Sequence, residues 1–597
     1  MFRARVTSSG ALFHRFVAKH LLLVLPSVFV AFAAEPVCAQ NAADRVQGKA
    51  LFQREWTHNS PKLPPRTVMS DASYIQLLKS LPGDGLGPMF NATSCEACHD
   101  RGGSSGVDRN VTMLIIDPRS PIIDSLLRSS TRQDADLRKQ LGRKIDSLFP
   151  GFISPRGAVA LDVVVHESSA RGGYRAIRKQ LTEGVPGGID PEWFDRSKRT
   201  PQAIAERPVI AGRRGDIDFY LSQRNSPPLF GMGLIDSISM TRLSQIAASQ
   251  NRRTSGQVTG RVGTGKFGWR AQTPSLDAFV RGACAGELGL QVPSTPQPPD
   301  LANLNYVSLG EDLNKKELAQ LVSYVQSLPA PVNSRQIVDD DWTTARHGKR
   351  LFAKIGCVDC HVENVSPARG IYSDLLLHDM GDLLQAPSPA SSGNLTGVPR
   401  LRVPFVPRDS IPIGSGSSIA SYYSSASAPL PYALERPEEP VFPYGQVPKL
   451  YYETKNASRL RWDLLQREWR TPPLWGVADS GPYLHDGRAT TLNAAIRWHG
   501  GEAQQSVMEY RSLIKADREA LLSFLKSLRS PVDPKPNQSK PDRSDHWIDS
   551  VAVDVSATTK SETATSDTAT PSTATSDTSN SDKDTNNAAL DVFATGY

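Results

Sequence analysis

The stretch CEACH at residues 95–99 decides the fold, and it recurs as CVDCH at residues 357–361. A covalently attached c-type haem needs two thiols one helical turn apart, which bind its vinyl groups, and a histidine directly after them, which binds the iron. A Cys-x-x-Cys pair without that histidine could be a redox dithiol or half of a zinc site. The sequence therefore predicts haem 1 and haem 2, with their thioethers at Cys95, Cys98, Cys357 and Cys360 and their proximal ligands at His99 and His361.

Two further segments repeat around the haem motifs. GKALF at residues 48–52 recurs as GKRLF at 348–352, and LVSYVQSL at 321–328 recurs as LLSFLKSL at 521–528. Each unit is predicted to begin with a helix, to continue with the haem motif, and to close with an amphipathic helix that a proline ends. This order is that of a cytochrome c domain. We therefore predict a mainly α fold with two cytochrome c-like haem domains, residues 40–340 and 341–531, related by internal duplication.

The segments between these landmarks differ in length and composition. The first unit carries an addition over residues 100–260, and residues 383–447 are rich in proline, serine and glycine, so we expect long loop insertions. From residue 532 to 597 the chain consists mainly of small polar residues. Such a segment cannot offset its ordering entropy by apolar burial, which predicts a disordered C-terminal tail.

The N-terminal residues 1–39 have the pattern of an export signal. Basic residues precede an apolar run over 21–34, and the small-residue sequence VCA follows at 37–39. A retained anchor helix is the alternative, although the apolar run is short and interrupted by Pro26. Because c-type haem is attached outside the bacterial cytoplasm, we predict a periplasmic protein with no stable membrane span once the signal is removed.

Composition narrows the class of protein. With 597 residues, of which 39% are apolar, the chain can form several packed cores. The net charge is +7, but part of it lies in the signal and haem propionates offset more, so we expect no nucleic-acid partner. If the signal is cleaved after Ala39, Cys38 is removed with it, and Cys284 is then the one cysteine of the mature chain outside the two haem motifs. It is most simply a small buried apolar residue.

A second histidine is aimed at haem 2. Apolar residues at 492, 495 and 496 share one face of a predicted helix with His499, and glycines at 500–501 end that helix. His499 is therefore either the distal ligand of haem 2 or a core histidine bonded to a carbonyl group. His378 and Met380, which follow the second haem motif, are alternative ligands.

The sequence indicates the residues on the distal side of haem 1 less clearly. Thr273 and Pro274 can start a helix whose apolar face includes Glu287. Burial raises the pKa of a carboxylic acid, which suits a general acid or base, whereas a salt-bridged or helix-end glutamate is the structural alternative. His166 and Met89 are candidate distal ligands of haem 1, and an open iron position fits equally well.

Several longer motifs are specific enough to suggest a family. Over most of residues 45–531 the chain resembles the di-haem cytochrome c peroxidase superfamily, and within it the di-haem oxidoreductases often called thiol-oxidoreductase-like. The motifs are PLWGVADSGPYLHDGRATTL at 473–492, FGWRA at 267–271, LLLHDMG at 375–381, EWRTPP at 468–473 and WHGGEA at 498–503.

The resemblance implies roles for individual residues. It places an acid–base glutamate near Glu287, beside the peroxidatic haem, and a tryptophan between the haems at Trp269, where packing in the core is the alternative. His499 occupies the place of the distal methionine of the electron-transfer haem. A calcium ion between the haems is also implied. Arg270 and Arg488, which follow the paired landmarks, are candidates for binding propionates, unless they are structural arginines.

These observations together predict an enzyme. In the leading hypothesis, haem 2 passes electrons to haem 1, which activates peroxide or oxygen, and a small redox protein is the electron donor or acceptor. One alternative is an electron-transfer cytochrome in which both irons have six ligands. Another is a di-haem oxygenase with an apolar substrate channel at haem 1. Thiol oxidation rests on the family name alone, because the sequence offers no second cysteine pair for it.

Overall fold

The computed structural model describes ten ranges of the chain. They are residues 35–59, 71–117, 120–129, 135–153, 159–170, 172–302, 306, 308–331, 342–387 and 465–531. Most of the predicted export signal, most of the loop predicted at 383–447, and the predicted tail from 532 lie outside the described residues. Within the described ranges, no helix combines the length and apolar character needed to cross a bilayer.

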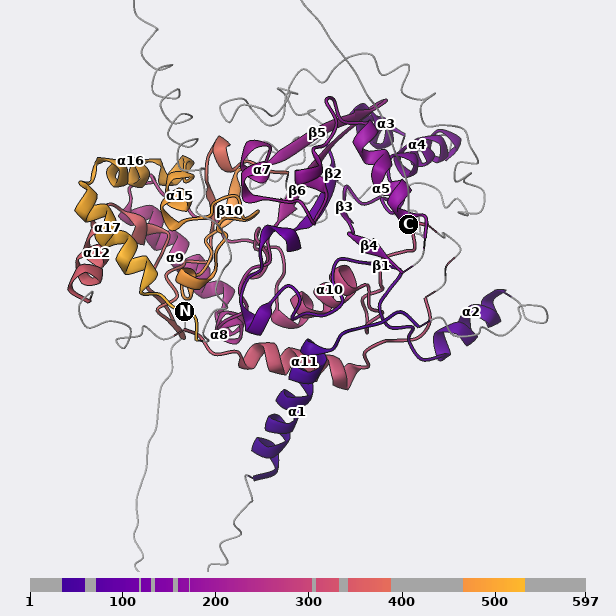
Figure 1. Ribbon diagram of the computed structural model, residues 1–597, viewed down its shortest axis with the longest axis horizontal. Helices are drawn as coiled ribbons and strands as arrows, with labels where there is room; N and C mark the ends of the chain where they lie inside the picture. The colour runs from indigo at the N-terminus through magenta and orange to yellow at the C-terminus, as the bar shows by residue number, and fades with distance from the viewer. Residues whose placement is uncertain are drawn as a thin grey trace, which may run out of the picture. The chain divides into compact units, whose positions relative to one another are not determined.

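The first repeat unit is framed by two crossing helices, α1 (Glu35–Gln53) and α11 (Lys315–Ser327) (Figure 1). They approach closely at Gly48, where a Cβ atom would lie 2.0 Å from the backbone oxygen of Gln320. One turn further, the rings of Phe52 and Tyr324 pack with centroids 5.2 Å apart. A glycine followed by an aromatic pair therefore sets this crossing.

The second unit has the same crossing, between α12 (Trp342–Lys354) and α17 (Lys515–Lys526). A Cβ atom on Gly348 would lie 1.9 Å from the backbone oxygen of Ala520. The rings of Phe352 and Phe524 follow, with centroids 5.3 Å apart. These four residues occupy the repeat positions that correspond to those of the first crossing. The matching contacts are what internal duplication predicts, and the duplication itself stays a prediction.

The addition in the first unit contains regular structure that the sequence did not indicate. Within it, four antiparallel strands form a sheet in the order β3-β2-β6-β5. Helices follow or precede these strands and pack on an apolar core that includes Ile145, Phe219 and Leu221. The elements are β2 (Val111–Ile116), α3 (Pro121–Arg128), α4 (Ala135–Leu148), β3 (Asp162–Val165), α5 (Tyr174–Glu183), β5 (Val209–Arg214) and β6 (Ile217–Arg224).

The other described helices and strand pairs lie outside the two helix crossings and the four-stranded sheet. The helices are α2 (Asp71–Ser80), α6 (Pro191–Phe194), α7 (Pro201–Glu206), α8 (Met232–Ser237), α9 (Met240–Arg253), α10 (Leu276–Leu288), α15 (Leu492–Arg497) and α16 (Gln504–Ser512). The strand pairs are β1 (Met89–Phe90) with β4 (Ser168–Ser169), β7 (Asn364–Val365) with β8 (Ala368–Arg369), and β9 (Leu377–Asp379) with β10 (Glu468–Arg470).

Two helix boundaries differ from the sequence-based expectation. Helix α10 is capped by Ser275, whose hydroxyl accepts the N–H of Ala278 at 3.2 Å, and not by Thr273. Thr273 instead pairs with Phe267 in a short antiparallel bridge, so it is already committed to a strand conformation. Helix α15 ends at Arg497, and the N–H of His499 bonds the oxygen of Ile496 in a tighter turn beyond it.

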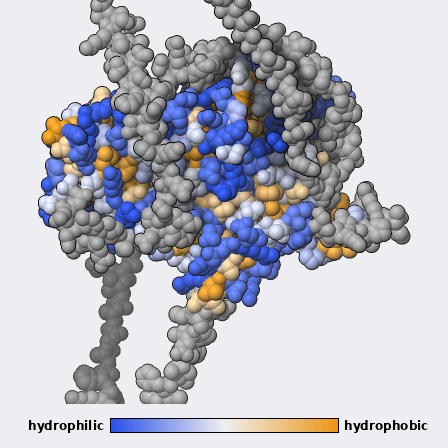
Figure 2. Space-filling model, viewed as in Figure 1, coloured by the Kyte–Doolittle hydropathy of each residue, from blue (hydrophilic) through white to orange (hydrophobic). Residues whose placement is uncertain are grey.

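Large apolar side chains are exposed at scattered positions on the described elements. On the face drawn in Figure 2, hydrophilic side chains predominate and the hydrophobic ones form small separate patches. The large exposed apolar residues lie on separate elements, and they are Val46, Ile75, Leu137, Met508 and Ile514. Scattered exposed apolar residues are normal for a globular protein and indicate no particular partner.

Candidate haem sites

Each haem motif forms one closed helical turn. In the first, the N–H groups of Cys98 and His99 bond the backbone oxygen of Cys95 at 3.2 and 3.0 Å. In the second, the N–H of His361 bonds the oxygen of Cys357 at 2.9 Å, across the short 3₁₀ helix at residues 357–359. One such turn presents two thiols and the following imidazole to the same haem. The local backbone thus fits covalent attachment of a haem at both sites.

The two proximal histidines are oriented in the same way. The Nδ1 atom of His361 lies 2.9 Å from the backbone oxygen of Tyr372, and that of His99 lies 3.3 Å from the oxygen of Gly103. A carbonyl oxygen only accepts, so in His361 Nδ1 carries the proton and the Nε2 lone pair is left for a metal. His99 has a second backbone partner, the carbonyl of Pro227, which like that of Gly103 favours the protonated ring. Burial lowers the pKa of both rings to about 4, which keeps them in the neutral form that binds iron.

His499 presents a third imidazole, near His361. Its Nδ1 atom lies 2.7 Å from the backbone oxygen of Ala495, so its Nε2 is again the nitrogen left for a metal. Burial lowers the pKa of His499. After burial, the neighbouring His499 is among the groups that lower the pKa of His361, which shows that the two rings lie within electrostatic reach. His361 and His499 are therefore candidates to hold the iron of the same haem.

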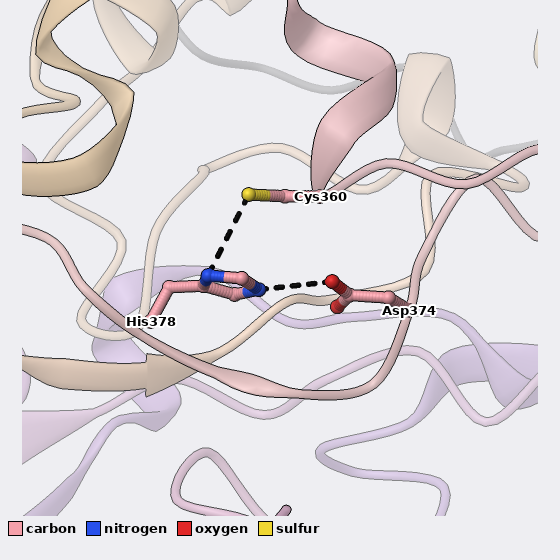
Figure 3. A group of neighbouring side chains, drawn as sticks. All are labelled: Cys360, Asp374 and His378. Carbon is pink, nitrogen blue, oxygen red and sulfur yellow. Dashed lines mark hydrogen bonds and ion pairs between the residues drawn. The ribbon is translucent and has the colours of Figure 1, made fainter. Parts of the chain in front are cut away.

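His378 is surrounded by partners, as Figure 3 shows for two of them. Its Nε2 lies 2.9 Å from a carboxylate oxygen of Asp374, and its Nδ1 lies 2.6 Å from one of Glu502 and 3.7 Å from the sulfur of Cys360. Burial alone would lower the pKa of His378, but the bonds to Asp374, Cys360 and Glu502 outweigh it and raise that pKa well above its usual value. Neither ring nitrogen is left for iron.

The same group of side chains has the composition of a metal site. One ligand atom each from Cys360, Asp374 and His378 lies within 4.8 Å of the others. Cys360, however, belongs to the second haem motif, where its sulfur is expected to form a thioether. A thioether sulfur is a poor ligand for a further ion, and so is an imidazole whose two nitrogens are both hydrogen-bonded to carboxylates. We therefore assign these three side chains to the surroundings of haem 2.

Glu287 lies beside the first haem motif. It is in the last turn of α10, and its Oε2 accepts a hydrogen bond of 2.6 Å from the side-chain amide of Asn91. Burial raises the pKa of Glu287, and the Asn91 bond acts in the opposite direction. Burial is the largest influence that raises the pKa of Cys98, and the charge of Glu287 is the second largest. The carboxyl group is therefore close to the cysteine at which haem 1 would be attached.

Trp269 lies between the two repeat units. Its indole N–H bonds the backbone oxygen of Asn225 at 2.8 Å, and its own backbone oxygen accepts the N–H of Arg470 at 3.0 Å. The first partner precedes Trp269 in the first unit and the second belongs to β10 of the second unit. This position is compatible with the conducting role that the resemblance implies, and that role stays a prediction.

The two predicted propionate-binding arginines are buried and have protein partners. The guanidinium of Arg270 lies 3.6 Å above the ring of Trp469 and donates to backbone oxygens of residues 386, 465, 466 and 468. The guanidinium of Arg488 forms a buried ion pair with Asp486, with Nη2 at 2.6 Å and Nε at 2.9 Å from Oδ2. Both side chains therefore form buried contacts with residues of the second unit. Their contact with haem propionates stays a prediction.

The candidate distal ligands of haem 1 are placed elsewhere or bonded to other groups. Met89 is fully buried in the apolar core of the sheet-containing addition. His166 is buried, and its Nε2 lies 2.9 Å from the backbone oxygen of Gly286, next to Glu287. Burial lowers the pKa of His166 to about 4. His166 is tied to a backbone oxygen through one nitrogen, as His499 is, and its buried Nδ1 has no hydrogen-bond partner, so His166 stays a candidate ligand.

Sequence reasoning missed several residues of these sites. Asn91 precedes Cys95 by four positions, but nothing in its surroundings marks it as a partner of Glu287. Glu502 lies within a motif used for the resemblance and Asp374 directly precedes another, yet the contact of Glu502 with His378 joins two segments that are 124 residues apart. Tyr372 acts through its backbone oxygen, which any residue could supply, so no sequence signal could have indicated it.

Comparisons with known proteins agree with a haem-dependent redox protein. Residues 441–528 match the family model described as "Di-haem oxidoreductase, putative peroxidase". The chain is 26% identical over 220 residues to hydrazine synthase subunit gamma of Kuenenia stuttgartiensis, across 35% of this chain and 50% of that protein. It thus spans about half the length of this curated relative.

A solved structure also aligns with the chain. It is titled "Kuenenia stuttgartiensis Hydrazine Synthase Pressurized with 20 bar Xenon", and the alignment has a TM-score of 0.25 and 18% identity. It covers 51% of this chain and 73% of the other. At that TM-score, the alignment carries no argument about the fold. The sequence matches support a di-haem redox protein with a general oxidoreductase role.

Proposed function

We propose that this chain is a periplasmic di-haem c-type oxidoreductase of the peroxidase kind. It binds two covalent haems, one at Cys95, Cys98 and His99 and one at the second motif. The second motif would hold a haem that supplies electron transfer with a small redox protein as donor or acceptor, and the first motif would hold the haem beside which peroxide reacts. When bound, a haem supplies one-electron chemistry and the cleavage of the O–O bond, while the protein sets ligation, access and proton supply.

The observation that carries the proposal is the shared geometry of the two haem motifs. In both, one turn closes between the first cysteine and the histidine, and Nδ1 of that histidine is tied to a backbone oxygen. A zinc site or a redox dithiol needs no such orientation of the adjacent ring. The repeated helix crossings at Gly48 and Gly348 support the proposal that two equivalent haem units carry these turns.

The surroundings of the two haems support different roles. At haem 2, His361 and His499 are both neutral, both tied through Nδ1, and both left with Nε2, which suits a six-coordinate electron-transfer haem. At haem 1, the described histidine near Glu287 is His166, which, unlike His499 with His361, is not among the groups that shift the pKa of the proximal His99. The nearby ionisable group is instead Glu287, a carboxyl whose raised pKa suits proton transfer.

Glu287 would act as the acid–base group at haem 1. Its carboxyl can take a proton from one peroxide oxygen and return it to the other, which assists cleavage of the bond between them. Trp269, held between the units by Asn225 and Arg470, would carry electrons from haem 2. The predicted calcium ion and the propionate contacts of Arg270 and Arg488 remain part of the proposal.

The test uses the mature holoprotein in its half-reduced state, mixed with peroxide in a stopped-flow spectrometer. Native protein should react rapidly at one haem, and Glu287→Gln should react about 10²–10⁴ times more slowly with both haems still bound. Glu206→Gln, an exposed glutamate on α7, is the matched control and should react as the native protein does.

The other outcomes each select a different function. If native protein does not react with peroxide but binds oxygen, the oxygenase alternative replaces the proposal. If it reacts with neither and both irons are six-coordinate by resonance Raman spectroscopy, the chain is an electron-transfer cytochrome. Equal rates for native protein and Glu287→Gln would make Glu287 a structural residue.

A further inference from the structure

Asn91 joins three segments of the chain that are distant in sequence. It lies between β1 and the first haem motif, and it is 6% exposed. Its side-chain Nδ2 donates to Glu287 at 2.6 Å, and its Oδ1 accepts the backbone N–H of Glu167 at 2.9 Å. Its backbone N–H also bonds the backbone oxygen of Glu287 at 2.7 Å. Asn91 therefore ties the end of α10 to the residues that follow β3.

The partner on the far side of this bridge is itself fixed. The carboxylate of Glu167 is paired with Arg199 at 2.9 Å and with Arg178 at 3.1 Å, and all three side chains are largely buried. Such a buried ion pair holds its backbone in one place, because removing either partner would leave an uncompensated charge. The N–H of Glu167 is thus a fixed reference point for the Asn91 amide.

This reference point decides which way the amide faces. The N–H of Glu167 can only donate, so the atom of the Asn91 amide that meets it must be the oxygen. The NH₂ group must then face Glu287. Asn91 consequently presents a donor, and not an acceptor, to Oε2 of Glu287. Among the described residues, Oε1 of Glu287 has no hydrogen-bond partner.

We propose that Asn91 is the positioning residue of Glu287, and that it fixes one carboxyl oxygen so that the other exchanges the proton with the reacting oxygens at haem 1. This inference rests on the proposed function, because it assumes chemistry at haem 1. It adds a residue that lies outside the recognised motifs and that touches neither substrate nor haem in this role. Its effect passes through the orientation of Glu287.

Electrostatics at the site supports the same role. Burial raises the pKa of Glu287, while the bond from Asn91 opposes that rise. The described groups that face this carboxyl are the Asn91 amide and the Cys98 sulfur. The nearby arginines contact other groups, since Arg178 and Arg199 pair with Glu167 and Arg196 donates to the backbone oxygen of Asn91. The Asn91 amide is therefore the side-chain donor that favours the carboxylate form of Glu287, while burial has the larger influence on its pKa.

The decisive variant is Asn91→Asp, which has nearly the same shape. Its carboxylate still accepts the N–H of Glu167, but the amide donor to Glu287 is replaced by a second acidic group, which disfavours the carboxylate form of Glu287. We expect the peroxide reaction to slow about 10²-fold, the typical effect of a misplaced catalytic group. Haem content and melting temperature should stay as in the native protein. Arg196→Ala, which removes a contact with the backbone of the same residue, is the matched control and should keep the native rate.

A second readout does not depend on turnover. The infrared band of the protonated Glu287 carboxyl is identified by its loss in Glu287→Gln and is then followed against pH. In Asn91→Asp two adjacent carboxyl groups share a proton, so the band should persist to higher pH than in the native protein. Asn91→Ala, which lacks the donor without adding a charge, should shift the band in the same direction.

The outcomes separate this inference from the proposed function. If the band of Glu287 disappears at the same pH in native protein and both variants, Asn91 does not control Glu287 and the inference is wrong. Equal peroxide rates in native protein and Asn91→Asp would also overturn it. If native protein does not react with peroxide, the proposed function fails, and the infrared shift alone then decides whether Asn91 positions Glu287.

Discussion

The crossing of α12 and α17 offers the sharpest test of the packing of the second unit. Gly348 leaves no room for a side chain, since a Cβ atom would lie 1.9 Å from the backbone oxygen of Ala520 and 2.5 Å from its carbonyl carbon. These are backbone atoms, which cannot rotate away as a flexible side chain would. Gly348→Ala must therefore separate the two helices and loosen the contact between Phe352 and Phe524.

The size of the effect follows from two opposing contributions. Replacing glycine by alanine inside a helix favours folding by about 1 kcal/mol where nothing obstructs the methyl group. Overpacking a tight contact costs about 1–3 kcal/mol, and a clash with backbone belongs at the upper end of that range. Gly348→Ala should thus lower the free energy of unfolding by about 2 kcal/mol.

A matched control lies in α10. Gly282 is helical and exposed, and no heavy atom would lie within 4 Å of its Cβ. Gly282→Ala should therefore stabilise the protein by up to about 1 kcal/mol, so the two variants should differ by about 3 kcal/mol. The same chemical change is made in both, and only the surroundings differ.

The assay is urea unfolding followed separately at the absorption of each haem, after the haems are distinguished by replacement of one cysteine pair. Gly348→Ala should shift the transition reported by haem 2, and Gly48→Ala, whose Cβ would meet Gln320, should shift that reported by haem 1. If Gly348→Ala is as stable as Gly282→Ala, the helices do not cross at this residue and the argument fails.

Three further predictions concern the haems. Mass spectrometry of the mature protein should show two covalent haems, and replacing Cys95 and Cys98 by alanine should remove one of them; a single haem in the native protein would contradict the assignment of two sites. His499→Gly should convert one low-spin haem to high-spin with haem content retained, and an unchanged paramagnetic resonance spectrum would exclude His499 as a ligand. Because burial raises the pKa of Glu287, a step that needs its carboxylate should fade as pH falls, beginning at a higher pH than for an exposed glutamate, and Glu287→Gln should abolish this dependence.

Local sequence signals predicted the parts of the protein that depend on neighbouring residues. The haem motifs closed into turns because a cysteine and a histidine four residues later are bonded through one helical turn. The helix that carries Glu287 was expected from its apolar spacing, although its cap is Ser275 and not Thr273. The sheet within the first unit was missed, because its short strands pair over distances that no local pattern reveals.

The sequence by itself determined the chemistry that the chain can hold, namely two haem attachment motifs and their proximal histidines, since covalent attachment requires a fixed local spacing. Only the tertiary structure decided which other groups gather there. It engaged both nitrogens of His378 with Asp374 and Glu502, it placed His499 within electrostatic reach of His361, and it brought Asn91 to Glu287. These contacts join residues far apart in the chain, and their positions follow from how helices and strands pack rather than from any local pattern.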